Sequence, residues 1–224
     1  MGHSILFVGK KDDIFCERAL DFVQSHFSES VAVLCRRQDP FPGEFDTWHG
    51  DFVISYLSPW IIPAGLLDRA KKAAINFHPG PPEYPGIGCT NFSLYDGVKK
   101  YGITCHHMAL EVDTGKIIRV FDFPIFQRES VLSLTQRSYS YLLVCFYEVI
   151  GTLLEGSPLP KSERQWTRKP LRRTELEELC RIQPEMDETE IGRRVRAVNY
   201  PGMPGAFVEL CGRRFVFPPP KEAR

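Results

Sequence analysis

The sequence of 224 residues predicts an α/β protein with a doubly wound, mostly parallel, Rossmann-like sheet and a short C-terminal appendage of helices and a β-hairpin. Three observations predict this fold class. Short apolar runs alternate with amphipathic stretches from residue 5 to residue 78, as in successive βαβ units. A hydrophobic content of 43% over this length suits one large domain with a sizeable core. The last stretch of the chain instead carries two short helical patterns and a pair of short β-like runs.

Four apolar runs near the N-terminus are the predicted parallel strands. They cover residues 5–9, 31–34, 51–56 and 73–78. Between the first two runs, Asp12 or Asp13 can cap a helix that continues to about residue 26 with one apolar face. Pro63 opens a predicted short helix over residues 63–72. Because ligands of such sheets bind beyond the carboxyl ends of the strands, the end of the fourth run is the expected ligand site.

The rest of the chain continues this pattern and then departs from it. A helix is predicted over 91–99, β-structure over 103–110 and 117–123, a long and largely buried helix over 132–154, a linker over 156–173, helices over 175–181 and 187–198, and a hairpin from 206–210 and 213–217 that Pro218–Pro220 ends. We expect residues 1–155 to form the catalytic core and residues 156–224 to form the linker, helices and hairpin packed on it.

Composition excludes several classes of protein. The 28 basic and 28 acidic residues give a net charge of zero, which argues against a nucleic-acid-binding protein. Seven cysteines with no Cys-x-x-Cys spacing indicate reduced, mostly buried thiols and a cytoplasmic location, with no metal site. The most apolar stretch, 141–154, is interrupted by Glu148 and is shorter than the roughly 20 residues of a membrane span. A dinucleotide-binding glycine fingerprint is absent, so NAD is not expected.

The candidate catalytic residues are Asn76, His78 and Asp113. Asn76 and His78 are two apart in a strand, so both side chains project to one side while Phe77 points into packing. Asp113 lies in a predicted turn that can aim its carboxylate at the same place. An amide that stabilises an oxyanion, an imidazole base and a carboxylate partner suit acyl transfer to an amine. The spacing alone is also compatible with a structural Asn-x-His pair, or with a metal site that includes His106.

These residues carry a family resemblance. Asn76-Phe77-His78-Pro79-Gly80, then Tyr84-Pro85-Gly86, then Asp113-Thr114-Gly115-Lys116-Ile117-Ile118, resemble the 10-formyltetrahydrofolate-dependent formyltransferases over roughly residues 5–154. The resemblance implies the formyltransferase fold, N10-formyltetrahydrofolate as co-substrate, and catalytic roles for Asn76, His78 and Asp113. Asn76 would polarise the formyl oxygen, His78 would be the base, and Asp113 would position His78 or a water.

The details most resemble the nucleotide-sugar N-formyltransferases, notably residues 76–92, 101–108 and 199–206. That branch implies an amino deoxysugar linked to a nucleotide as the acceptor, and its relatives suggest a homodimer. Few residues follow the long helix and the net charge is zero, which disfavours the initiator-tRNA branch. Residues 9–13 lack the phosphate loop of the glycinamide ribonucleotide branch. A 10-formyltetrahydrofolate hydrolase, a glycinamide ribonucleotide formyltransferase and a non-catalytic folate- or nucleotide-binding module remain alternatives.

The resemblance also implies where the ligands lie. The cofactor-lining candidates are Tyr56, Leu57, Ser58, Trp60 and Ile61, and the sugar-contacting candidates are Glu83, Tyr84 and Asn91. A strand exit packed by Trp60 and Ile61 explains the first segment equally well. The basic residues of segment 161–173 can serve a diphosphate, although we favour a solvated linker.

Overall fold

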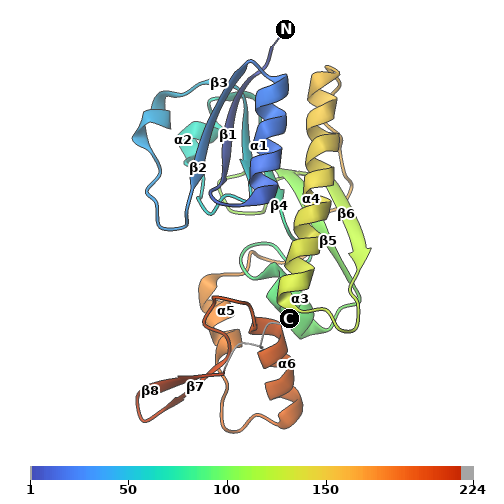
Figure 1. Cartoon of the computed structure of the whole chain (residues 1–224). Helices are drawn as coiled ribbons and strands as arrows, with labels where there is room; N and C mark the ends of the chain where they lie inside the picture. Colours follow the sequence, from blue (N-terminus) through green and yellow to red (C-terminus); the bar gives the residue numbers. More distant parts are fainter. Residues whose placement is uncertain (1, 218–224) are drawn as a thin grey trace.

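The computed structural model describes residues 2–217 and contains a six-stranded sheet with helices on both faces (Figure 1). Its strands are β1 (Ser4–Lys10), β2 (Glu29–Cys35), β3 (Gly50–Tyr56), β4 (Ala70–His78), β5 (Lys100–His107) and β6 (Ile117–Pro124). The spatial order is β2-β1-β3-β4-β5-β6. The first four strands are parallel, whereas β5 runs antiparallel to both of its neighbours. The predicted α/β class with a mostly parallel sheet is therefore confirmed.

Two helices cover one face of the sheet. They are α1 (Ile14–His26) and α4 (Val131–Leu154). Asp13 caps α1 by accepting hydrogen bonds from two backbone N–H groups, and Ser130 with Ser133 forms a capping box on α4. Phe146 of α4 packs against the aromatic rings of β1, β3 and β4 in a dry core, which fixes α4 along the middle of the sheet.

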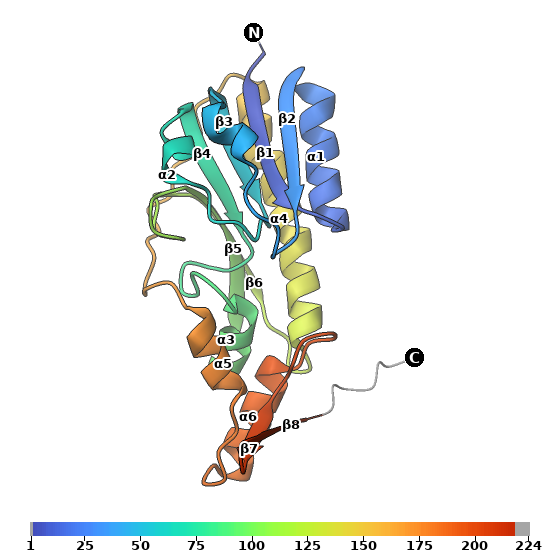
Figure 2. The same cartoon turned by 90° about the vertical axis from the view of Figure 1, so that its left-hand side faces the viewer.

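The opposite face carries smaller elements, the 3₁₀ helix η1 (Gly43–Thr47) and the single turn α2 (Ala64–Leu67). Figure 2 shows α2 on the side of the sheet away from α1. Leu6, Val8 and Val53 of the sheet and Leu66 of α2 form the apolar cluster of this face.

Two predicted boundaries near this face are wrong. The helix expected over 63–72 is only α2, and β4 already begins at Ala70. Ala73 and Ile75 continue one buried face of β4 toward its N-terminal end, while Lys71 and Lys72 extend the strand into solvent. The strand expected over 103–110 ends at His107, where the chain leaves the sheet for the loop that carries Asp113.

The C-terminal elements lie beyond the carboxyl end of the sheet, next to α3 (Cys89–Asp96) (Figures 1 and 2). They are α5 (Arg173–Cys180), α6 (Glu188–Val198), β7 (Phe207–Leu210) and β8 (Arg213–Val216). Asn91 of α3 donates to the Ala197 carbonyl, and Tyr95 donates to Glu190, so α6 is fastened to α3. The predicted Pro218–Pro220 terminator lies outside the described residues.

Candidate active site

The candidate active site lies on the α2 face of the sheet, at the carboxyl end of β4. Ile75 and Phe77 face the core, so the alternation of a strand turns Asn76 and His78 to the opposite face. In the antiparallel β4–β5 pair, Asn76 lies directly opposite His106, which is buried on the same face. The pairing therefore adds one polar side chain to the two that the sequence placed together.

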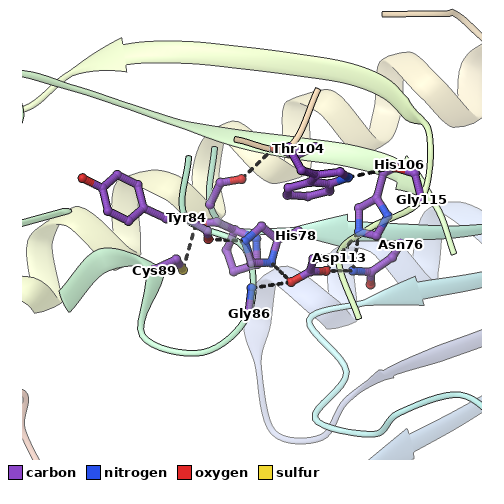
Figure 3. A network of polar contacts seen from close by, with 12 residues as sticks. Asn76, His78, Tyr84, Gly86, Cys89, Thr104, His106, Asp113 and Gly115 are labelled. Atoms are coloured by element: carbon purple, nitrogen blue, oxygen red, sulfur yellow. Dashed lines mark hydrogen bonds and ion pairs between the residues drawn. The ribbon is translucent and has the colours of Figure 1, made fainter. Parts of the chain in front are cut away.

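Asp113 joins these side chains from the loop between β5 and β6 (Figure 3). Its Oδ2 lies 3.2 Å from Nδ1 of His78 and accepts the Gly86 N–H at 2.7 Å. Its Oδ1 lies 3.1 Å from Nε2 of His106 and accepts a hydrogen bond from Nδ2 of Asn76 at 3.4 Å. One buried carboxylate thus contacts all the polar groups of the site, and the three predicted catalytic residues are brought together.

The environment of Asp113 keeps it ionised. Burial alone would raise the pKa of this carboxyl group. The charge of His78 and the hydrogen bond and charge of His106 act in the opposite direction, as does the Gly86 N–H, and the pKa falls to about 2. At neutral pH the site therefore contains a fixed negative charge between two imidazoles.

The hydrogen bonds of His78 determine which of its nitrogens can act as a base. Nε2 lies 3.0 Å from the Tyr84 carbonyl oxygen, which can only accept, so Nε2 carries the proton. In the neutral ring the unprotonated nitrogen is then Nδ1, which faces Asp113. A proton taken up at Nδ1 gives an imidazolium in which both N–H groups have an oxygen acceptor.

The loop that supplies the Tyr84 carbonyl, residues 79–89, is held firmly. A Cβ atom at Gly80 would lie 2.6 Å from Nε2 of His78, so glycine is needed for the His78–Tyr84 hydrogen bond. Thr104 donates to the Gly80 carbonyl at 2.8 Å and Tyr101 donates to the Pro79 carbonyl at 2.9 Å. The loop therefore orients His78 instead of moving freely over it.

The turn around Asp113 is also constrained, and Trp166 is part of that constraint. Asp113 has a positive φ of 50°, an uncommon conformation for a non-glycine residue. A Cβ atom at Gly115 would lie 1.8 Å from the His107 carbonyl oxygen, so no other residue fits there. The indole Nε1–H of Trp166 donates to the Gly115 carbonyl at 2.8 Å. The same indole meets the rings of His106 and His78 edge-on, at centroid distances of 5.0 Å and 6.0 Å.

Sequence reasoning missed the roles of His106 and Trp166. In the sequence, His106 is a candidate only for a metal site, and Trp166 lies in the predicted linker 156–173. The position of His106 opposite Asn76 follows from the strand register, which no local pattern encodes. Trp166 reaches the site because its segment folds back, with hydrogen bonds from Thr167 N to Pro82 O and from Leu171 N to Pro85 O.

The predicted sugar-contacting residues have other contacts in this structure. Glu83 pairs with Arg164 at 2.8 Å. The Tyr84 ring is buried, and its hydroxyl donates to Asp96 at 2.8 Å. The Asn91 side chain is used to hold α6, as described above. Of the three, the structure brings only Tyr84 to the candidate catalytic residues, through the contact of its backbone carbonyl with His78.

The predicted cofactor-lining segment follows β3, beside the site. Tyr56 lies in the core against Phe77 and Phe146, so its side chain does not face this edge. Leu57 has a positive φ of 53° and turns the chain out of the strand. Ser58 accepts from the Trp60 N–H, and the indole of Trp60 donates to the Asp39 carbonyl. Ile61 is 72% exposed, so it is the large apolar side chain of the segment that is most available to a ligand.

Two further findings concern the whole described chain. Among residues 2–217, no group of three or more His, Cys, Asp or Glu side chains is placed to hold a metal ion. Within the same range, no helix is both long and apolar enough to cross a membrane. The cysteines are all free, and five of the seven are buried, as the sequence predicted.

Comparison with known proteins gives the family. The model of the formyl transferase family matches residues 30–142, which is half of the chain. The GDP-perosamine N-formyltransferase of Brucella melitensis is 28% identical over 179 residues, which cover 80% of this chain and 67% of the relative. The methionyl-tRNA formyltransferase of Geobacillus thermodenitrificans is 29% identical over 60% of this chain, but the match spans only 43% of that enzyme.

Solved structures share the fold at lower identity. A 4-N formyltransferase from Francisella tularensis superimposes with a TM-score of 0.77 at 18% identity, covering 99% of this chain and 98% of that chain. An N-formyltransferase from Helicobacter canadensis, in complex with folinic acid and dTDP-3-aminofucose, gives a TM-score of 0.74 at 16% identity, covering 95% of this chain and 85% of that chain. With the family model matching half of its length, including the strand that carries Asn76 and His78 and the loop that carries Asp113, this chain belongs to the formyl transferase family.

Proposed function

We propose that this chain is an N-formyltransferase that moves a formyl group from N10-formyltetrahydrofolate to the amine of a nucleotide-linked amino deoxysugar. The observation that carries the proposal is the position of Asp113, whose two oxygens contact His78 on one side and Asn76 with His106 on the other. This arrangement unites an amide donor and a base around one carboxylate. Acyl transfer to an amine needs these groups and no covalent nucleophile.

Asn76 is the proposed group that stabilises charge on the formyl oxygen. Its side chain is half-buried, whereas His78, His106 and Asp113 are almost fully covered. The amide is therefore the part of the group that a bound formyl oxygen can reach. A preoriented amide N–H is worth most where charge develops during the reaction, because its orientation is already fixed by its neighbours.

His78 is the proposed base. The acceptor amine must lose a proton as its nitrogen bonds to the formyl carbon, and Nδ1 of His78 takes that proton through a water on Asp113. The new bond to the amine replaces the bond between the formyl carbon and N10, and the proton passes on to the departing N10. While His78 carries this proton, Asp113 and the Tyr84 carbonyl stabilise the imidazolium.

The surface beside the site fits the flat heterocycle of a folate. Ile61, Leu110 and Val112 are large apolar residues that are 72%, 79% and 41% exposed; Ile61 lies in the segment after β3, and Leu110 and Val112 lie in the loop that carries Asp113. Trp60 and Met108, their neighbours in the chain, pack against the same apolar cluster on the α2 face. Exposed apolar side chains next to polar groups are typical of small-molecule sites.

The charge balance and the relatives support a small acceptor. Zero net charge does not provide the basic surface that a tRNA acceptor calls for. The GDP-perosamine N-formyltransferase of Brucella melitensis is matched over 80% of this chain and 67% of its own length, which supports a nucleotide-linked sugar as the acceptor.

The test is formyl transfer in vitro with N10-formyltetrahydrofolate and a panel of nucleotide-linked amino sugars, with methionyl-tRNA as a competing acceptor. Transfer to an amino sugar that falls at least a hundredfold in Asn76→Ala, His78→Ala and Asp113→Asn supports the proposal. A surface variant, His49→Ala, should keep its rate. Near-normal rates in all three site variants would overturn the assignment. Formate released without any acceptor would instead identify a hydrolase.

We also propose that the protein acts in the cytoplasm and as a homodimer. Seven free thiols are compatible with a reducing compartment. Leu210 and Phe215 on the β7–β8 hairpin are 51% and 56% exposed. Among the described residues, β8 pairs with β7 along one edge and with no strand along its outer edge. A second copy of the hairpin is the proposed partner of this apolar edge.

A further inference from the structure

We propose that Lys116 and Lys161 form the diphosphate-binding subsite for the nucleotide-linked acceptor. This inference rests on the proposed function and adds a location to it. The two lysines line a hollow of about 700 Å³ between the start of β6 and residues 160–166 of the segment that follows α4. They come from separate parts of the chain, one at the start of β6 and one in the segment after α4, and both line the same hollow.

The hollow adjoins the catalytic group through Trp166. The indole of Trp166 lines the hollow and also contacts the rings of His78 and His106. Gly115, whose carbonyl accepts the indole N–H, lines the hollow too, and it is only two residues from Asp113. A diphosphate held here would keep the attached sugar next to the indole, on the way to Asn76 and His78.

A second hollow, of about 560 Å³, also borders this segment, and three of its four lining cations are already paired. Arg164 lies 2.8 Å from Glu83 and 3.2 Å from Asp122. Lys100 lies 3.1 Å from Asp122, and Arg168 lies 3.6 Å from Asp96. Lys99 is left as the single lining cation without a carboxylate partner among the described residues, so this hollow offers an anion one free ammonium group instead of two.

The proposed subsite differs in this respect. Among the described residues, neither Lys116 nor Lys161 has a carboxylate oxygen within 4.0 Å. Glu163 lines the hollow as an exposed residue, and its single negative charge is smaller than the two positive charges of the lysines. The pKa of His107 is lowered by its burial and by the nearby His106 and Lys116, so its ring adds no charge at neutral pH. Two unpaired ammonium groups, each with three N–H donors, suit the spread charge of a diphosphate.

The basic residues of segment 161–173 thus have two different roles. Arg164 and Arg168 fasten it to the sheet and to the loop that bears Tyr84, where Arg168 also stacks on the Tyr84 ring. Lys161 remains available for a ligand. This division follows from ion pairing, and the composition of the segment does not reveal it.

The experiment measures the dissociation constants of dTDP, GDP and UDP by calorimetry. The proteins compared are the wild type, Lys116→Gln, Lys161→Gln, the double variant, and Lys169→Gln as a control. Lys169 is an exposed lysine of the same segment that lines neither hollow. We expect each single variant to bind the favoured nucleotide about fivefold more weakly, and the double variant about 20-fold more weakly, with a reduced dependence on salt. The control should bind as the wild type does.

The same variants give a kinetic readout. In the double variant, the KM for a nucleotide-linked amino sugar should rise by about the same factor, while kcat and the KM for N10-formyltetrahydrofolate stay within about twofold. A midpoint temperature of thermal unfolding equal to that of the wild type establishes that the variants are folded. Binding by the double variant within twofold of the wild type would overturn the subsite and leave the proposed function standing. A wild-type protein that binds none of the three nucleotides would overturn both the subsite and the nucleotide-linked acceptor.

Discussion

Asn76 and His106 face each other across the antiparallel β4–β5 pair, with Nδ2 of the amide 3.1 Å from Nε2 of the imidazole. His106 Nδ1 lies 2.8 Å from the His107 carbonyl oxygen, which fixes the ring plane. Nε2 of the same ring also lies 3.1 Å from Oδ1 of Asp113. The second histidine therefore contacts both the Asn76 amide and the carboxylate that accepts from it, and helps to hold the Asn76 side chain in place.

The first prediction concerns this pair. His106→Ala should lower kcat about tenfold to a hundredfold, with a smaller effect on the KM of either substrate, because Asn76 loses one of the two groups that orient it. Steady-state kinetics on purified variants is the measurement. His106→Gln retains a side-chain hydrogen-bonding group and should recover part of the rate. If the alanine variant matches the wild type in kcat, Asn76 is oriented without His106.

The second prediction separates the two contacts of Trp166. Trp166→Phe keeps an aromatic ring against the histidines but loses the N–H that bonds to the Gly115 carbonyl. We expect it to retain more than about a third of kcat, whereas Trp166→Ala should lose about tenfold or more in kcat with a smaller change in the KM of either substrate, because both imidazoles then lose the ring that packs against them. Equal kcat and KM values in both variants would show that the indole does not position the site.

The third prediction follows from the pKa of Asp113, which is about 2 in the folded protein and about 3.9 in an unfolded chain. A carboxyl group with a lowered folded pKa stabilises the protein above its unfolded pKa and loses that contribution as the pH falls toward the folded pKa. The free energy of unfolding of the wild type, relative to Asp113→Asn, should therefore fall by about 2 kcal/mol between about pH 5 and about pH 2. Urea unfolding at a series of pH values measures this difference. A difference that stays constant with pH would mean that the histidines do not hold the charge.

The fourth prediction concerns the proposed homodimer. Because side chains alternate along strands, Leu210 and Phe215 share the outer face of the hairpin, and Val216 lies on the other face. Phe215→Glu should convert a dimer to a monomer in sedimentation velocity, since a charge would be buried at the contact. Val216 is similarly exposed, at 51%, so Val216→Glu is the matched control and should remain dimeric. A wild-type monomer at all concentrations would rule out the dimer itself.

Local patterns were enough to predict most of the fold and the common direction of Asn76 and His78. The apolar runs predicted β1 to β4 because a parallel strand is buried on both faces and reads as a continuous apolar segment. The two-residue spacing of Asn76 and His78 predicted their common direction for the same geometric reason. The helix predicted over residues 63–72 was wrong. A proline and several alanines and lysines fit the pattern of a helix there, but pairing with β3 makes the residues from Ala70 onward part of β4.

Contacts between distant segments could not be predicted in this way. His106 reaches Asn76 only through the β4–β5 register, and Trp166 reaches both histidines only because residues 160–171 fold back over the loop that bears Tyr84. Neither contact has a signature in the spacing of nearby residues. The use of Arg164 and Arg168 as structural ion pairs is of the same kind, since their partners lie far away in the sequence.

The last prediction concerns Tyr56, whose side chain is fully buried between the sheet and α4 and whose hydroxyl has no hydrogen-bond partner among the described residues. Burial raises the pKa of this phenol, so it stays neutral, but an unpaired hydroxyl in an apolar core still costs stability. Tyr56→Phe keeps the ring contacts with Phe146 and removes that hydroxyl, so the free energy of unfolding should rise by about 1 kcal/mol.

The Tyr56→Phe variant should leave the KM for N10-formyltetrahydrofolate unchanged, since the ring faces the core. Chemical denaturation and donor kinetics on the same preparation test both points, with Tyr56→Leu as a control that should lose stability by opening a cavity. A raised KM for N10-formyltetrahydrofolate in Tyr56→Phe would mean that the hydroxyl turns toward this ligand, as the family resemblance implies for the segment at the end of β3.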